Sequence, residues 1–272
     1  MHPVLLKLGW FSVYSFGFML ALSFLLGIYV SGRRAKRYGV APEHILDLSV
    51  YVILSGVVGS RLLYVAFHID EYRNFIDVFA LWQGGATLYG GFLLAILVGY
   101  IFSRKRNLGF LVLGDIISAA LALGIALTRV GCFLSGCCYG KQTALPWGVT
   151  FPPGSPAGAY ERELALAERA PAVALHPSQL YDSFLALATF TLLLALRGRL
   201  ARKNGMAFGL MLFCYGISRF IVDFTRYYET NMMVTGSINF NQLLSAAFVI
   251  AGAYLLFRKT REKQSADPKR RA

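Results

Sequence analysis

Arginines stand inside three otherwise apolar segments of the sequence. Arg61 lies in GVVGSRLLY, Arg129 lies in ALTRVGCF, and Arg219 lies in YGISRFIVDFTRYY. A charge inside a lipid bilayer is costly, and the charges that remain there usually face a cavity and serve a function. A guanidinium group binds phosphate or carboxylate through two parallel hydrogen bonds. These three residues therefore predict an anion site, and apolar walls around it would suit an anionic phospholipid.

Further charges follow Arg219 at helical spacing. Asp223 and Arg226 come four and seven residues later, which would place all three side chains on one face of a helix. Asp223 can pair with either arginine. One interpretation of the Arg219–Asp223 pair is a neutral tether between helices. The other is an anion site, because three arginines against one nearby carboxylate leave a surplus of positive charge.

Two other motifs contain residues capable of proton transfer. Tyr89 precedes Gly90 and Gly91 in LYGGFLL, where the glycines allow close approach of backbone or lipid. The tyrosine can belong to the site or can anchor the helix at the membrane interface. His176 opens HPSQLYD, and the proline and serine that follow it suit the start of a helix. Its imidazole can act as a general base near neutral pH, or it can be an ordinary loop residue.

Three of the four cysteines cluster in GCFLSGCCYG, at positions 132, 137 and 138. Their spacing lacks the paired C-x2-C of structural zinc sites, so no metal site is predicted. If the compartment is oxidising, Cys132 can form a disulfide with Cys137 or Cys138. A reactive thiol and simple packing of small side chains are the other interpretations. Cys214 stands apart from them, inside a predicted helix.

The segments that must position these residues are long and apolar. Hydrophobic residues make up 56% of the 272 residues and charged residues only 15%, against about 25% in an ordinary soluble domain. Several runs are free of charge, except for Asp182 in the third: 10–30, 78–103, 179–196 and 238–257. Each approaches the roughly 20 residues that cross a bilayer. The sequence therefore predicts an all-α, polytopic membrane protein.

We expect seven transmembrane helices, at 10–31, 44–68, 86–103, 108–133, 178–197, 205–224 and 238–258. They form one domain over residues 1–258. A long outer loop over 139–177 is expected to carry a short surface helix at 159–170. No signal peptide is expected, because the first apolar run is long and no basic region or cleavage site frames it. The basic tail at 259–272 is expected to be disordered.

The net charge of +13 would suggest nucleic acid in a soluble protein, but its distribution indicates a membrane. Basic clusters occupy 33–37, 104–106, 197–203 and 258–271, which are alternate loops of the predicted topology. Positive charge gathers in cytoplasmic loops. The N-terminus is therefore expected outside and the C-terminus in the cytoplasm, with membrane lipids as partners and no nucleic acid. On this topology the three membrane arginines lie in the outer halves of their helices.

Taken together, the motifs resemble the prolipoprotein diacylglyceryl transferase family over nearly the whole chain. They occur in the family's order: Tyr14 in the first helix, GSRLLY at 59–64, YGG at 89–91, TRVGCFLSGCCYG at 128–140, HPSQLYD at 176–182 and YGISRFIVDFTR at 215–226. The family signature GR-x-G-N-F-x-N-G-E-x-x-G is matched at Arg129, Gly131, Phe133, Gly136 and Gly140.

The resemblance implies seven helices of the same orientation in the bacterial cytoplasmic (inner) membrane, with the active site facing the outer leaflet. It implies transfer of the diacylglyceryl group of phosphatidylglycerol to the lipobox cysteine thiol of a prolipoprotein signal peptide, releasing glycerol phosphate without a cofactor or metal. Arg129 and Arg219 would hold the lipid phosphate, while Tyr89 or His176 assists deprotonation of the thiol. The remaining substrate-binding residues would be Tyr14, Arg61, Gly90, Gly91, Gly131, Gly136, Gly140, Asp223 and Arg226.

The chain also departs from the family pattern. Tyr89 replaces a histidine, Cys132 an asparagine and Cys137 a glutamate, while Asp223 stands where the family has glutamate. A tyrosine with a pKa of about 10 is a poor base at neutral pH. Other functions therefore stay open. They are a diverged phospholipid-dependent transferase or thiol-active protein with another acceptor, in which Cys132, Cys137 and Cys138 form a thiol site, and a phospholipid-binding protein without catalysis.

Overall fold

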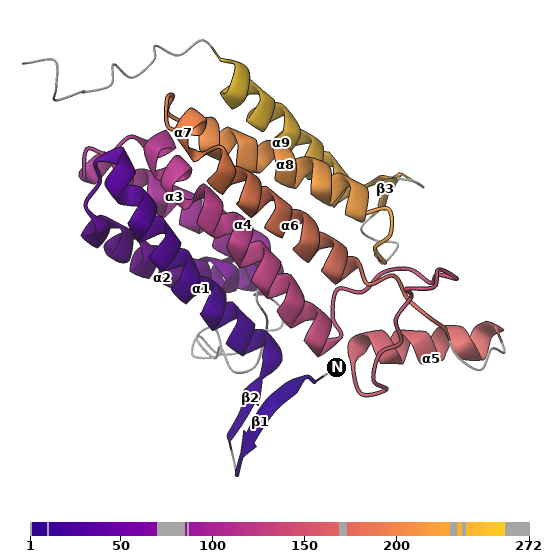
Figure 1. The fold of residues 1–272 in the computed structure, drawn as a ribbon. Coiled ribbons are helices and arrows are strands. Elements are labelled where there is room, and N and C mark those ends of the chain that lie inside the picture. Colours follow the sequence, from indigo (N-terminus) through magenta and orange to yellow (C-terminus); the bar gives the residue numbers. More distant parts are fainter. Residues whose placement is uncertain are drawn as a thin grey trace, which may run out of the picture. The chain divides into compact units, whose positions relative to one another are not determined.

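The computed structural model describes residues 2–9, 11–69, 85, 87–168, 173–228, 233–235 and 238–258. The chain divides into two compact units, one made of Met1–Val30 with Gly114–Ala272 and the other of Ser31–Leu113. Nine α-helices and two small sheets make up the regular structure of the described residues (Figure 1).

The larger unit begins with a β-hairpin instead of a helix. Strands β1 (Val4–Leu8) and β2 (Phe11–Tyr14) pair antiparallel, with Gly9 at a φ of +60° between them, and α1 (Ser15–Ala35) follows. The prediction that the first helix starts at residue 10 is therefore wrong. The residues at 11–14 are apolar but rich in aromatic and β-branched types, which also suit a strand. Tyr14 consequently ends a strand and does not lie in a helix.

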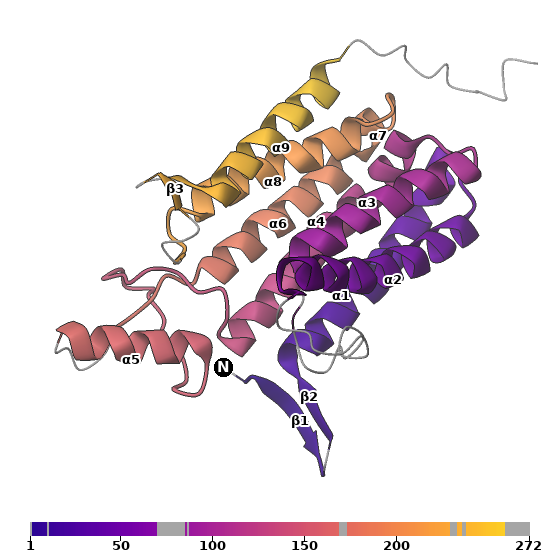
Figure 2. The ribbon, with the colours of Figure 1, turned by 180° about the vertical axis from the view of Figure 1, so that it is seen from behind.

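Four long helices of this unit run side by side in both views (Figures 1 and 2). They are α4 (Phe110–Ser135), α6 (Ser178–Ala195), α8 (Met206–Val222) and α9 (Phe240–Phe257), with the short α7 (Arg197–Leu200) after α6. Alanines from α4 and α8 fill the buried core, together with Leu193, Leu200 and Met211. Small side chains bring helix backbones close together, which is the main source of helix association in lipid.

Glycines hold α8 against α9. A Cβ atom at Gly216 would lie 2.7 Å from the carbonyl oxygen of Ser245, and one at Gly252 would lie 2.7 Å from that of Gly209. Helix α9 starts with a capping box, in which the side chains of Asn239 and Gln242 accept each other's backbone N–H groups at 2.9 and 3.0 Å. These contacts fix the antiparallel pair of helices that carries Arg219.

A buried carboxylate sets the start of α8. Asp115 on α4 is fully buried, and it accepts the backbone N–H groups of Gly205 at 2.6 Å and Phe208 at 2.9 Å. The first N–H groups of a helix lack partners within the helix, and a negative charge there also interacts favourably with the helix dipole. Asp115 therefore ties the first turn of α8 to α4.

A small region extends beyond the ends of α4 and α6 (Figure 2). Its helix α5 (Pro156–Glu168) confirms the surface helix predicted at 159–170, starting three residues earlier, while residues 169–170 lie outside the described residues. Phe151, Ala157, Val173 and Leu175 form its core. The carboxylate of Glu161 accepts the backbone N–H of Phe151 at 2.9 and 3.0 Å. Strands β3 (Met233–Thr235) and β4 (Ile238–Asn239) precede α9.

The smaller unit contains a 3₁₀ turn (Lys36–Tyr38) and the helices α2 (Pro42–Phe67) and α3 (Leu88–Lys105). These two helices cross at paired glycines. A Cβ atom at Gly59 would lie 2.5 Å from the carbonyl oxygen of Gly90, and one at Gly91 would lie 2.7 Å from that of Gly56. Gly90 and Gly91 thus make a close backbone approach between helices, one of the two roles that the sequence left open for them.

Substitution of Gly90 with alanine is expected to destabilise this crossing. The new Cβ would overlap the backbone of Gly59 and lie 2.5 Å from Leu63 Cβ. Overpacking of this kind costs about 1–3 kcal/mol. Gly99→Ala is the matched control on the same helix, because a Cβ at Gly99 would meet no atom within 4 Å. Unfolding of both variants in mixed micelles tests the expectation, and equal stability of the two would contradict it.

Each predicted transmembrane segment overlaps one long observed helix, in the same order: α1, α2, α3, α4, α6, α8 and α9. Five helical segments among the described residues are long and apolar enough to cross a membrane: Ser15–Tyr38, Pro42–Phe67, Phe110–Ser135, Ser178–Ala195 and Phe240–Phe257. Helix α8 is apolar but shorter. The count of seven spans, the orientation and the single domain stay predictions, and the tail at 259–272 lies outside the described residues.

Candidate active site

The centre of the site is a carboxylate that meets arginines from three segments. Asp182 lies in the second turn of α6, and its Oδ2 atom is 3.1 Å from Arg129 Nε of α4 and 2.9 Å from Arg219 Nη1 of α8. Arg226 Nη1, just beyond α8, lies 3.9 Å from the same oxygen. The Asp182 side chain is only 7% exposed. One buried oxygen therefore orients the guanidinium groups of Arg129 and Arg219 and lies near that of Arg226.

Arg219 also joins this carboxylate to a second one. Its Nη2 atom lies 2.9 Å from Asp223 Oδ1, which confirms the predicted pairing of these two residues. The hydroxyl of Tyr228 donates to the same Asp223 oxygen at 2.7 Å and accepts a hydrogen bond from Arg219 Nη2. The guanidinium of Arg219 is thereby fixed on two sides, as expected of a buried charge.

Arg226 lies near Asp182 from a position after the end of α8, which the sequence did not predict. Helix α8 ends at Val222, so the expected placement of Arg226 on the same helical face as Arg219 is wrong. The chain turns at Thr225, whose carbonyl accepts the N–H of Lys141 at 2.8 Å, and Arg226 forms a β-bridge with Gly140. Its guanidinium carbon lies 5.5 Å from the centre of the Tyr228 ring. The loop after α4 therefore positions Arg226.

Asp182 and Tyr228 are the members that sequence reasoning missed. A signal for Asp182 existed, because it is the only charge in the apolar run 179–196. For Tyr228 the signal was weaker, since it is one of two tyrosines following Arg226. With Asp182 included, three arginines face two carboxylates, and the surplus is one positive charge. We call the five charged side chains at 129, 182, 219, 223 and 226 the arginine network.

Two hollows lie near these residues. A small cavity of about 10 Å³, enough for about one water molecule, is lined by Ala122, Ile125, Asp182, Ala186, Thr189, Met211, Tyr215 and Ser218. An open, wholly apolar groove of about 280 Å³ follows the contact of α8 with α9, lined by Ile217, Phe220, Ile221, Ala246, Val249 and Ile250. The groove presents only hydrocarbon surface on the side of α8 that faces α9, whereas Arg219 of α8 pairs with Asp182 of α6.

His176 lies just before α6 in an aromatic setting. Its Nδ1 atom is 3.3 Å from the hydroxyl of Tyr181, which also accepts a hydrogen bond from Trp147 Nε1 at 2.8 Å. Partial burial and the charge of Lys141 lower the pKa of His176 below its ordinary value of 6.5. The imidazole is therefore neutral at neutral pH and retains a nitrogen that can accept a proton.

The signature glycines shape the backbone around the network. A Cβ at Gly131 would lie 3.0 Å from Met19 Cβ of α1, and one at Gly140 would lie 2.5 Å from Ser178 Oγ. Gly136 has a φ of +68°, where a Cβ would also lie 2.5 Å from that of Ser155. All three glycines thus lie where an added side chain would meet neighbouring atoms, and their part in substrate binding stays a prediction.

The remaining predicted residues lie elsewhere in the chain. Arg61 and Tyr89 belong to the smaller unit, where Arg61 is buried and donates from Nη1 to the Gly85 carbonyl at 3.0 Å. Tyr89 is 42% exposed at the start of α3, next to the glycine crossing. Tyr14 is 62% exposed at the end of β2. Their roles stay predictions.

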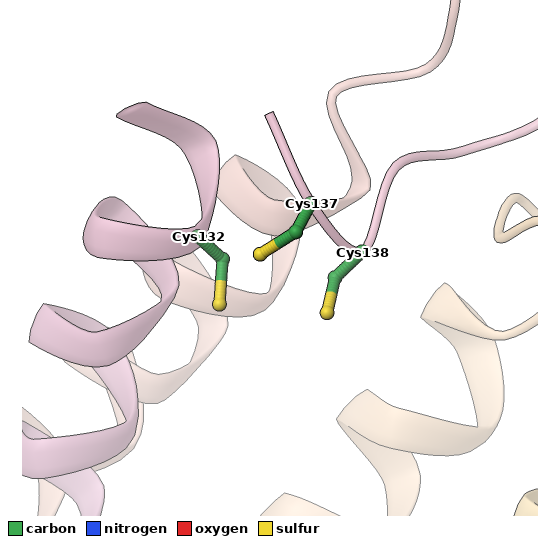
Figure 3. A group of neighbouring side chains, drawn as sticks. All are labelled: Cys132, Cys137 and Cys138. Carbon is green, nitrogen blue, oxygen red and sulfur yellow. The ribbon is translucent and has the colours of Figure 1, made fainter. Parts of the chain in front are cut away.

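The three clustered cysteines come together at the end of α4 (Figure 3). Cys132 is buried, Cys137 and Cys138 are half-buried, and their sulfur atoms all lie within 4.8 Å of one another. All four cysteines are free thiols, so the disulfide that the sequence left open is not formed in this structure. Hydrogen bonding with Cys132 and Cys137, together with the charges of Arg226 and Arg129, lowers the pKa of the Cys138 thiol.

Known proteins resemble this chain over nearly its whole length. The model of the family described as prolipoprotein diacylglyceryl transferase matches residues 3–258. The chain belongs to this family. The phosphatidylglycerol–prolipoprotein diacylglyceryl transferase of Geobacter sulfurreducens is 32% identical over 266 residues, covering 96% of both chains. That of Solidesulfovibrio magneticus is 33% identical over 97% of both, and that of Clostridium tetani 34% identical over 83% of this chain and 86% of its own.

Membership of the prolipoprotein diacylglyceryl transferase family agrees with the resemblance first seen in the motifs. Together with the apolar helices, it makes the protein a multi-pass membrane protein. Exposed apolar side chains on several helices, such as Leu62, Leu93 and Ile250, provide the surface that lipid would cover.

Proposed function

We propose that this chain transfers the diacylglyceryl group of phosphatidylglycerol to the lipobox cysteine of a prolipoprotein signal peptide. The observation that carries the proposal is the buried arginine network, found in a chain that matches the family almost end to end. The protein acts in the bacterial cytoplasmic membrane through seven spans. The N-terminus and the site face outward, and the C-terminus is cytoplasmic.

The reaction is a displacement at carbon. The peptide thiolate attacks the glyceryl carbon that carries the phosphate ester, forming a C–S bond while the C–O bond to phosphate breaks. Glycerol phosphate leaves with that bonding pair, and the thiol proton passes to a base. Negative charge grows on the leaving phosphate, and Arg129 and Arg219 stabilise it at fixed positions, which is commonly the largest contribution to catalysis.

Asp182 has a positioning role in this proposal. By accepting from Arg129 and Arg219 it fixes both guanidinium groups before the lipid arrives, so little reorganisation is needed in the transition state. Arg226 supplies the surplus charge, since it lies farther from the Asp182 oxygen than the other two arginines. The apolar groove between α8 and α9 is suited to hydrocarbon.

The direct test is transfer by the purified protein in phosphatidylglycerol vesicles to a lipobox-cysteine peptide, followed by mass spectrometry. A thioether-linked diacylglyceryl group on the peptide is the expected product, absent with a peptide that has serine in place of the cysteine. A relative with established activity serves as the positive control. Phosphatidylglycerol binding without product, while the control works, would indicate a different acceptor or a binding protein.

The pH dependence tests His176 as the proton acceptor. Because its pKa is lowered, the neutral, basic form persists to more acidic pH, and kcat/KM is expected to fall only as the pH drops below 6.5. His176→Gln is expected to reduce kcat/KM about 100-fold at neutral pH and to remove that acidic limb. Tyr181→Phe, which removes only the neighbouring hydroxyl, should keep it. An unchanged profile in His176→Gln would exclude His176 as the proton acceptor.

A further inference from the structure

The cysteine cluster has no part in the proposed reaction. The structure nevertheless brings the sulfur atoms of Cys132, Cys137 and Cys138 close together. Figure 3 shows Cys132 on the last turns of α4 and Cys137 and Cys138 on the chain that leaves it, with the three sulfurs gathered between them. All sulfur–sulfur distances are within 4.8 Å. A zinc–sulfur bond of about 2.3 Å places the sulfurs of a tetrahedral site roughly 3.8 Å apart. Shifts of about 1 Å therefore suffice to surround one ion.

The backbone turn that gathers these sulfurs uses two left-handed residues. Gly136 ends α4 with a φ of +68°, and the N–H groups of Gly136 and Cys137 donate to the carbonyls of Phe133 and Cys132 at 3.2 and 3.1 Å. This is the Schellman pattern, which folds the chain back over the last turn. Cys138 then has a φ of +60°, a conformation that costs a non-glycine residue free energy and is held by its surroundings.

Neighbouring contacts hold this turn in place. Nε2 of the buried Gln179 donates to the carbonyl of Cys137 at 2.8 Å, and the N–H of Gly140 donates to the carbonyl of His176 at 3.1 Å. The site is therefore supported from α6 on one side and from the loop before α6 on the other. Such outer contacts are what orients the ligands of a metal site.

We propose that Cys132, Cys137 and Cys138 form a three-sulfur site for one thiophilic d¹⁰ cation, the class that contains Zn²⁺ and Cu⁺. Thiolate sulfur selects ions of this class over hard cations such as Mg²⁺ or Ca²⁺. No fourth His, Cys, Asp or Glu ligand joins the group within the described part of the chain. The ion therefore has three protein ligands and an open position, and binding releases the thiol protons.

A disulfide explains this arrangement less well. A disulfide would use two sulfurs and leave the third, whereas all three are mutually close.

A bound ion also has a structural consequence, because it would join the loop to α4, and this loop continues into Gly140, the β-bridge partner of Arg226. Loading of the site would thus fix the segment that positions Arg226. The proposal itself does not depend on the transfer reaction.

Metal binding is tested on the full-length protein, purified without oxygen in detergent with a phosphine reductant and stripped with a chelator. We expect one Zn²⁺ per chain after desalting, measured by mass spectrometry of the element. In a parallel arm, Cu⁺ is offered against a chromogenic chelator, and one Cu⁺ per chain is expected. Single Cys→Ser variants at 132, 137 and 138 are expected to weaken binding about 100-fold or more. Cys214→Ser is the matched control and should bind as the parent does.

A second measurement needs no variant. Bound Zn²⁺ is expected to slow alkylation of Cys137 and Cys138 by a maleimide at least tenfold, read by peptide mass spectrometry, while Cys214 reacts at an unchanged rate. The proposal is overturned if neither ion binds more tightly to the parent than to the three variants and neither protects the thiols. It is also overturned if the freshly prepared protein, before reduction, holds a disulfide among the three cysteines.

Discussion

Replacing Asp182 with asparagine is expected to abolish detectable transfer and to lower the free energy of unfolding by about 3–5 kcal/mol, the usual cost of removing one partner from a buried ion pair. Its Oδ2 atom lies within 3.1 Å of both Arg129 and Arg219, and the side chain is buried. Without this charge, three arginines share only Asp223. Their mutual repulsion then moves the guanidinium groups away from the positions that we propose for the lipid phosphate.

Asp115→Asn is the matched control for this prediction. Asp115 is also a buried acid, but it accepts backbone N–H groups at the first turn of α8, whereas Arg219 lies in the last turn of that helix. We expect it to lose stability in detergent while the folded fraction keeps its transfer rate. If Asp182→Asn instead lost stability but kept the rate per folded molecule, the arginine network would be a structural tether only.

Arg219→Lys is expected to reduce kcat/KM by about 100- to 1,000-fold, the loss seen when a single preorganised donor to a developing oxyanion is removed. The reason is geometric, because Arg219 reaches Asp182 with Nη1 and Asp223 with Nη2 at 2.9 Å each. A lysine ammonium is a point charge on a flexible chain and cannot bridge both carboxylates while facing a phosphate. The variant keeps the net charge, so binding of the lipid should weaken less than the reaction rate.

Arg106→Lys provides the comparison. Arg106 forms an ion pair with Asp47 at 3.0 Å, but both side chains are 46% exposed, and pairs of this kind contribute about 0–1 kcal/mol. We expect its transfer rate and its stability to match those of the parent. An Arg219→Lys protein as active as Arg106→Lys would show that positive charge alone, without the guanidinium fork, is sufficient at position 219.

The sequence predicted the helices well because length and apolar composition decide them in a membrane protein. The same signal failed at the start of α1 and at the end of α8. Residues 11–14 carry no charge and continue the apolar run of the helix that follows, so hydropathy could not separate strand β2 from α1. At the other end, Asp223 and Arg226 continued the helical spacing, but α8 ends at Val222, where the chain turns toward the loop after α4.

The site was predictable only where the signal lay within one segment. Arg129 and Arg219 are visible as charges in apolar runs, and Arg219–Asp223 is a spacing of four residues. The pairing of Arg219 with Asp182 spans 37 residues and depends on how α6 packs against α8. For the three cysteines the sequence left a disulfide, a reactive thiol and simple packing open, and it did not predict a three-sulfur site. Its geometry depends on the turn at Gly136 and on the left-handed backbone of Cys138, which cysteine spacing does not encode.

The glycine crossings described for α2 with α3 and for α8 with α9 have a consequence for the order of folding. Each joins two helices that are neighbours in sequence, so each hairpin closes with a small loss of chain entropy. The contacts of Asp182 must wait until α4, α6 and α8 have met. We therefore expect the hairpins to form early after membrane insertion and the charged centre to assemble last. Time-resolved hydrogen exchange that protected α6 before α9 would contradict this order.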